Sequence, residues 1–269
     1  MRTRLLIGVA VAGLAATAGA GTARAGGIAP GFAQNGVLGP GGRVRYVAVS
    51  TQHTTDLNAV GSAGGKLLRS VTLNGVYGIP AVAYDGTAGG LSRDGRTLVI
   101  STFPGAAAST RFLVVDTRTL AVRYSIRLAG FWSFDALSPN AATMYLIQFT
   151  QTKGAIHYIV RAYDMHTRRL VEGAIADKSE PGPMSGLPIS RAVTADGAWA
   201  YTLYDKGDGH SAFIHALDTA ARAAICIDVD LPAGTFGSGR VRLTLSPDGR
   251  QLVIRGRDGT TLKTVPAPR

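Results

Sequence analysis

Carboxylates and arginines recur at matching places along the chain, so they could meet in one site. They are Asp85, Asp135, Arg191 and Arg242. Two carboxylates that lie close together can act as acid and base or bind a cation, and an arginine beside them can hold an anion. The same charges could instead neutralise one another as an ion-pair network. We favour this structural interpretation, because the sequence does not set the distance between the carboxylates.

These charged residues are placed by a short motif that occurs four times without gaps. Its copies are L-S-R-D-G-R-T-L-V-I from Leu91, L-S-P-N-A-A-T-M-Y-L from Leu137, V-T-A-D-G-A-W-A-Y-T from Val193 and L-S-P-D-G-R-Q-L-V-I from Leu245. Asp135 and Arg191 stand three residues before the Ser or Thr of their copies, and Arg242 stands four before Ser246. Tyr84-Asp85 resembles Phe134-Asp135 if a Gly-rich insertion follows it. The copies are 46, 56 and 52 residues apart, which suits one four-stranded unit each.

Each copy has the chemistry of a tight turn between two strands. Proline presets φ for the turn, Asp or Asn follows it, and glycine supplies the left-handed residue that closes a bulged hairpin. Ala141 replaces the glycine in the second copy, where a left-handed conformation costs about 1 kcal/mol. We therefore expect that turn to shift its register onto Asn140.

A second hairpin is predicted downstream of three of the motif copies. Asp116, Asp164 and Asp218 occupy the same position in three aligned segments. An aspartate there can accept hydrogen bonds from main-chain amides two residues further on, which stabilises a chain reversal. We interpret these aspartates as turn formers and not as ligands.

Apolar residues fill both faces of the strand that follows the first turn. Leu98 and Ile100 point one way and Val99 the other, so this strand needs neighbours on both sides. The stretch from Ser246, the strand from Tyr46 and the run from Val114 resemble the repeats of YVTN-type and WD-repeat-like bacterial β-propellers. The resemblance covers roughly residues 44–266. It implies an all-β propeller, and its known members include binding scaffolds and a few enzymes.

The repeat count predicts five four-stranded blades, with four as the alternative. The segment 56–73 aligns with 111–128, so an incomplete unit precedes the three complete ones, and the last unit lacks a fourth strand. These truncations are complementary. We therefore expect strands from the N- and C-terminal ends to share one blade and close the ring.

The first 25 residues have the features of a cleaved signal peptide. Two arginines precede an apolar run, and Ala23-Arg24-Ala25 fits the cleavage rule. Residues 26–42 form a Gly/Pro-rich lead-in that we expect to run over the surface, and 43–269 form one domain. The net charge is +11, and removal of three arginines leaves +8. We expect a secreted or extracytoplasmic protein with no integral membrane segment after cleavage and no nucleic-acid partner.

Few other residues indicate a catalytic, disulfide or metal site. The single cysteine, Cys226, cannot form an internal disulfide, and the five histidines lack the spacing of a zinc site. The segment 205–210 has the composition of a calcium loop but only two carboxylates, so we interpret it as a polar turn. His215 is expected to be a packed or surface histidine. The longest excursion, 176–188, could equally be a binding loop or a tolerated insertion.

Without a reactive motif, we expect a monomeric, non-enzymatic scaffold that binds a protein or cell-wall polymer through one face of the ring. No metal or cofactor is predicted. The alternative is a propeller hydrolase or lyase, similar to a lactonase, that uses Asp85, Asp135, Arg191 and Arg242 at the channel mouth. A third possibility is a structural envelope protein whose positive charge attracts polymers, an attraction that salt would screen.

Overall fold

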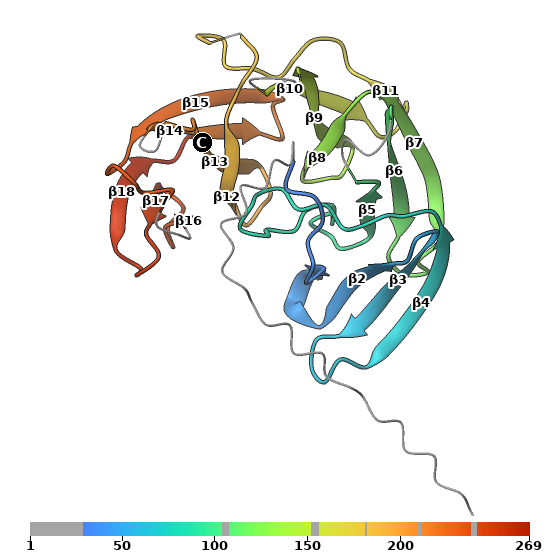
Figure 1. Cartoon of the computed structure of the whole chain (residues 1–269). Coiled ribbons are helices and arrows are strands. Elements are labelled where there is room, and N and C mark those ends of the chain that lie inside the picture. The colour runs from blue at the N-terminus through green and yellow to red at the C-terminus, as the bar shows by residue number, and fades with distance from the viewer. Residues whose placement is uncertain (1–28, 104–107, 152–155, 181, 209–210, 238–240) are drawn as a thin grey trace, which may run out of the picture.

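The chain folds into five antiparallel sheets that are arranged around a common centre (Figure 1). The computed structural model describes residues 29–103, 108–151, 156–180, 182–208, 211–237 and 241–269. The only helix in these ranges is the short 3₁₀ turn η1 (Pro40–Gly42), so no described helix is long and apolar enough to cross a membrane. The predicted signal peptide lies outside the described residues.

Residues 37–170 supply the first three sheets. The first sheet contains β1 (Val37–Leu38), β2 (Val44–Ser50), β3 (Thr54–Gly61) and β4 (Leu67–Asn74). The second contains β5 (Thr97–Ser101), β6 (Ser109–Asp116) and β7 (Val122–Ala129). The third contains β8 (Trp132–Leu137), β9 (Thr143–Gln151), β10 (His157–Asp164) and β11 (Arg169–Leu170). Each sheet pairs strands that follow one another in the chain, as repeated hairpins require.

The C-terminal half supplies the last two sheets. The fourth sheet contains β12 (Leu187–Val193), β13 (Trp199–Asp205), β14 (Ser211–Asp218) and β15 (Ala223–Asp230). The fifth contains β16 (Arg242–Leu245), β17 (Gln251–Arg255) and β18 (Thr261–Pro266). The prediction of an all-β chain built from short antiparallel units is therefore confirmed.

Neighbouring sheets pack through apolar faces. Every residue of β5 is buried, because Leu98 and Ile100 pack toward the first sheet while Val99 packs toward the third. A further apolar cluster joins the fourth sheet to the fifth through Leu203 and Leu252. Burial on both faces supplies the main stabilisation of such stacked sheets, at about 25 cal/mol per Å² of apolar surface.

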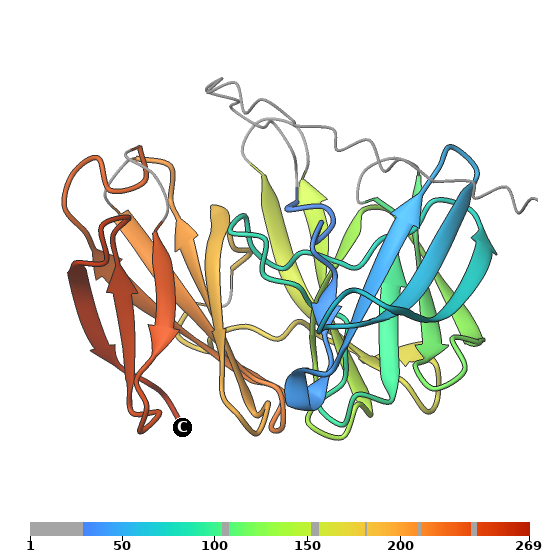
Figure 2. The same cartoon turned by 90° about the horizontal axis from the view of Figure 1, so that it is seen from below.

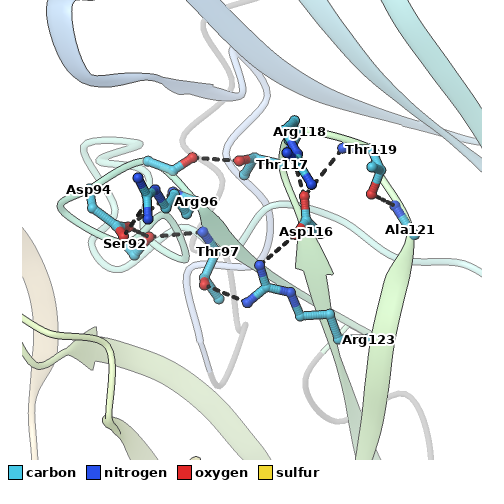
Figure 3. A network of polar contacts seen from close by, with 11 residues as sticks. Ser92, Asp94, Arg96, Thr97, Asp116, Thr117, Arg118, Thr119, Ala121 and Arg123 are labelled. Carbon is cyan, nitrogen blue, oxygen red and sulfur yellow. Dashed lines mark hydrogen bonds and ion pairs between the residues drawn. The ribbon is translucent and has the colours of Figure 1, made fainter.

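Hydrogen bonds within each turn explain why the motif repeats (Figure 3). In the first copy the Ser92 hydroxyl donates to Asp94 at 2.6 Å and accepts from the Thr97 amide at 2.9 Å, while the Asp94 carboxylate accepts from the Arg96 amide at 3.0 Å. Ser246 and Asp248 repeat this arrangement in the last copy. The Ser and the Asp of the motif therefore recur because both take part in the same hydrogen-bond network of the turn.

The second hairpin turns form as the aspartates predict. Asp116, Asp164 and Asp218 each accept hydrogen bonds from the amides two and three residues further on, at 2.8–3.3 Å. Thr117 then donates its hydroxyl to the Gly95 carbonyl at 2.6 Å, and Thr219 does the same to Gly197. Both kinds of turn therefore lie on one side of the molecule, the lower edge in Figure 2. We call this side, formed by the turns 92–97, 116–121, 138–143, 164–169, 194–199, 218–223 and 246–251, the turn face.

The turn at Ala141 does not shift its register. Ala141 itself adopts the left-handed conformation, with φ of 55°, and its amide donates to the Ser138 carbonyl at 2.8 Å, as the Gly95 amide does to Ser92. The Ser138 and Asn140 side chains form the same local network as in the other copies, and this network holds the register against the cost of the β-carbon.

Replacing Ala141 with glycine should raise the free energy of unfolding by about 1 kcal/mol, because glycine adopts positive φ without a steric penalty. The reverse change, Gly249→Ala, places a β-carbon at φ of 67° in the equivalent turn and should destabilise the chain by a similar amount. Urea unfolding of both variants measures the two effects. A loss of stability in the Ala141→Gly variant would contradict the prediction.

Two expectations about the N-terminal region are wrong. Within the described residues, the first and fifth sheets share no strand, because β1 to β4 form one sheet and β16 to β18 another. The lead-in does not run over the surface: Phe32 pairs with Pro80, Ala29 and Ala33 are buried, and β1 adds to the first sheet. Its apolar alanines and Phe32 pack among the inner strands, which stabilises this path more than solvent exposure would.

Candidate functional site

A cavity of about 250 Å³ opens on the turn face between the innermost segments of three sheets. Its wall consists of the segment 87–91, the end of β8 with the turn that follows it, and the end of β12 with its turn. Leu91, Leu137 and Val193 supply apolar surface near the mouth, and Val193 is half exposed. The innermost segments of the second, third and fourth sheets therefore meet at this cavity.

Asp135 and Arg191 meet in this cavity as a buried ion pair. Their side chains are 5% and 3% exposed, and Arg191 Nη2 lies 2.5 Å from Asp135 Oδ1. Arg191 Nη1 donates to the Asp135 carbonyl as well. A bulge in the register of β8 at Asp135 turns this residue toward β12. Two of the four predicted residues therefore come together, and their charges are directed at each other.

Asp85 lies outside the cavity wall and links inner strands instead. Its carboxylate accepts hydrogen bonds from the amide and hydroxyl of Thr87 and, at 2.7 Å, from the Ser190 hydroxyl. Ser190 Oγ in turn accepts from the Leu243 amide at 3.0 Å. Asp85 thus connects a loop with β12 and β16, which is a structural role.

Arg242 does not reach the other three residues. It lies at the start of β16, paired with Arg255 of β17, and its side chain is exposed. Its neighbour Leu243 faces the core of the fourth and fifth sheets, and successive residues of a strand face opposite sides. Of the four residues, the structure brings Asp135 and Arg191 together in the cavity and places Asp85 and Arg242 outside its wall. Ligand binding by these residues stays a prediction.

Sequence reasoning missed a row of polar residues that continues from Arg191 across the fourth sheet. Arg191 pairs with Thr202, Thr202 with His215, and His215 with Cys226, so all four side chains lie on one face. Buried atoms without a hydrogen-bond partner among the described residues include Asp135 Oδ2, Arg191 Nε, Thr202 Oγ1 and His215 Nε2. A signal was available, since His215 and Thr202 interrupt otherwise apolar strands.

Within this row, burial changes the pKa of His215 strongly. This residue is buried between apolar clusters, and burial lowers its pKa to about 4, with the charge of Arg191 lowering it further and that of Asp135 opposing the shift. The Cys226 sulfur lies 3.9 Å from His215 Nδ1, and burial raises the pKa of this thiol to about 11. Both groups are therefore neutral near pH 7.

The other segments singled out in the sequence form turns or packing contacts. Asp205 accepts from the Gly207 amide and Asp208 from the Ser211 amide, as in a polar turn, while residues 209–210 lie outside the described ranges. The excursion 176–188 packs along the sheets, since Met184 pairs with Tyr158 and the Asp177 carboxylate accepts from the Cys226 amide. Within the described residues, no three His, Cys, Asp or Glu side chains lie together as a metal site.

At the cavity mouth, the side chain of Arg93 bridges two turns. Arg93, from the turn before β5, donates from Nε to the Ala195 carbonyl at 3.3 Å, although the two residues are 102 positions apart. Its side chain is exposed and lines the cavity. The mouth therefore combines an accessible guanidinium with apolar walls, a combination that can bind a small, partly apolar group with an anionic end.

No protein-family model and no curated protein matches the sequence. Solved structures resemble the fold. A chain of Kuenenia stuttgartiensis hydrazine synthase aligns with a TM-score of 0.57 and 14% identity, over 86% of this chain and 70% of that one. At this identity the likeness shows the fold alone.

Other solved structures align less closely. The Dos1 propeller has a TM-score of 0.46 and 10% identity over 86% of this chain, which spans 57% of its length. A putative TolB from Agrobacterium tumefaciens has a TM-score of 0.45 and 13% identity, over 85% of this chain and 79% of that one. Two of the solved structures that align with this chain are described as propellers, those of Dos1 and of Cps50. The five antiparallel sheets of three or four strands agree with the all-β repeat architecture that the sequence predicts.

Proposed function

We propose that this chain is a secreted, non-enzymatic β-propeller of five blades that binds a protein or cell-wall polymer through the turn face. The Asp135–Arg191 pair carries the proposal. Both charges lie inside the protein and neutralise each other, so they act as a rigid floor for the cavity and not as a free acid and a free anion-binding group. The exposed surface around the cavity, with Val193 and Arg93, is available for contact with a partner.

Blocking the cavity mouth tests this proposal. Val193→Trp should fill the mouth and reduce co-sedimentation of the purified mature chain with a cell-envelope fraction by about tenfold or more, since the centre of an interface contributes most of its affinity. Val49→Trp is the matched control, because Val49 is 55% exposed on β2, outside the cavity wall. Equal retention of both variants would contradict binding through the turn face.

The competing proposal of a hydrolase or lyase predicts turnover. Under the binding proposal, the mature chain should show no activity on a panel of lactones, glycans and phosphoesters. Activity that Arg191→Lys abolishes while the variant keeps its circular dichroism spectrum would replace the binding function with an enzymatic one.

A further inference from the structure

The mouth of the cavity places an accessible cation beside an apolar wall. Arg93 reaches across from one turn to the Ala195 carbonyl of another, and Val193 and Leu137 lie on the wall beneath it. The Arg93 Nε–Ala195 contact orients the side chain at the mouth, which reduces the conformational freedom that is lost when an anion binds. An arginine prepared in this way can receive a carboxylate through two N–H groups at once.

The turn face carries exposed arginines together with the aspartates of the same turns. The arginines are Arg93, Arg96, Arg118, Arg168, Arg222 and Arg250. The aspartates of the same turns direct an oxygen to main-chain amides: Asp94 to the Arg96 amide, Asp196 to the Ala198 amide and Asp248 to the Arg250 amide. Three of these arginines already have partners on the turn face, since Arg96 lies 4.0 Å from Asp94, Arg222 donates to Thr143 and Arg168 lies over the Tyr124 ring. Arg93, at the mouth, is bound through Nε to an uncharged carbonyl, so its guanidinium favours an acidic group of a partner.

The size of the cavity limits what can enter it. A volume of about 250 Å³ is below the usual range for a drug-sized ligand and accommodates one large apolar side chain with its adjoining backbone. The floor, formed by Asp135 and Arg191, is a neutral pair overall. Selectivity for charge must therefore arise at the mouth, at Arg93.

We propose that the cavity binds an acidic segment of a partner protein, with one apolar side chain inserted between Leu91, Leu137 and Val193 and a neighbouring carboxylate paired with Arg93. This inference rests on the proposed function, because it assumes that the turn face is the binding surface. Charge complementarity selects the partner: an acidic peptide supplies both the anion for Arg93 and the apolar side chain for the wall, whereas a phosphate polymer supplies only the anion.

Fluorescence anisotropy with a labelled peptide of sequence Glu-Glu-Leu-Glu-Glu tests the inference on the mature chain. Arg93→Gln should weaken binding about tenfold, because a charge-assisted pair is lost, and Val193→Trp should abolish it by filling the cavity. The matched control is Arg257→Gln, which removes another exposed cation, between β17 and β18 and outside the cavity wall. Replacing the peptide's leucine with glycine, or its glutamates with lysines, should reduce binding to a similar extent.

Several results would overturn the inference. They are the absence of peptide binding at 1 mM, equal binding of the lysine peptide, and an Arg93→Gln variant that binds as the unmodified chain does. Long-chain polyphosphate that displaces the peptide and binds the Val193→Trp variant equally well would assign the surface to a polymer. If the peptide fails while Val193→Trp still reduces envelope binding, the proposed function stands without this partner; if both fail, neither stands.

Discussion

Replacing Arg191 with methionine should lower the free energy of unfolding by about 3–5 kcal/mol, one of the two largest effects that we expect in this protein. The change leaves the Asp135 carboxylate buried without its partner, and an uncompensated buried charge costs far more than an exposed one. Urea unfolding at pH 7, followed by circular dichroism, measures the loss.

Two controls separate the buried pair from a general effect of losing an arginine. Arg123→Met breaks an ion pair with Asp116 that is 2.6 Å long but partly exposed, and it should cost far less, because water screens the two charges. The double variant Asp135→Leu/Arg191→Met removes both buried charges and should be more stable than Arg191→Met alone. An Arg191→Met loss no larger than that of Arg123→Met would show that the pair is accessible to water.

Acidification from pH 6.5 to pH 4 should lower the stability of the chain by about 3 kcal/mol through His215. The unfolded chain binds a proton at this residue near pH 6.5, whereas the folded chain binds one only near pH 4, because burial lowers the pKa. In this window the unfolded state therefore holds more protons. Stability is fully present above pH 6.5 and is lost as the pH falls toward 4.

The variant His215→Gln should flatten this pH dependence, and His53→Gln should leave it unchanged because His53 is exposed. The carboxylates of the turns do not obscure the result. Hydrogen bonds, with Arg123 the largest contributor, lower the pKa of Asp116 to about 2, so the stability that such a group contributes is lost from about pH 5 downward, and the unmodified chain and both variants share this loss. A His215→Gln variant that retains the full slope would assign the effect to another group.

The turns were predicted correctly from the sequence, whereas a blade shared by the two chain ends was not found. The two outcomes have different physical causes. In each motif copy the decisive hydrogen bonds join residues five or fewer positions apart, as between Ser92 and Thr97 or Ser246 and Gln251. Such contacts are encoded in the spacing itself. The pairing of Phe32 with Pro80 is not, because it joins distant segments whose apolar residues have many possible partners.

Only two of the four candidate site residues meet in the structure, again because contacts between distant segments are not encoded in the local spacing. Asp135 and Arg191 hold equivalent positions on inner strands of adjacent sheets, so the repeat alone brings them near each other. Asp85 is bound by Ser190, which is 105 residues away, and Arg242 faces outward because Leu243 beside it occupies the core. Neither outcome follows from the motif alignment.

By itself, the sequence determined the antiparallel units, their turns and the buried faces of their strands, since local hydrogen bonding and the alternation of apolar residues are written into consecutive positions. Only the tertiary structure decided that the two terminal sheets remain separate, that the lead-in packs among the inner strands, and that Arg93 rather than Arg242 stands at the cavity. Those features depend on how whole sheets rotate and stack against one another, and that is set by packing among residues far apart in the chain.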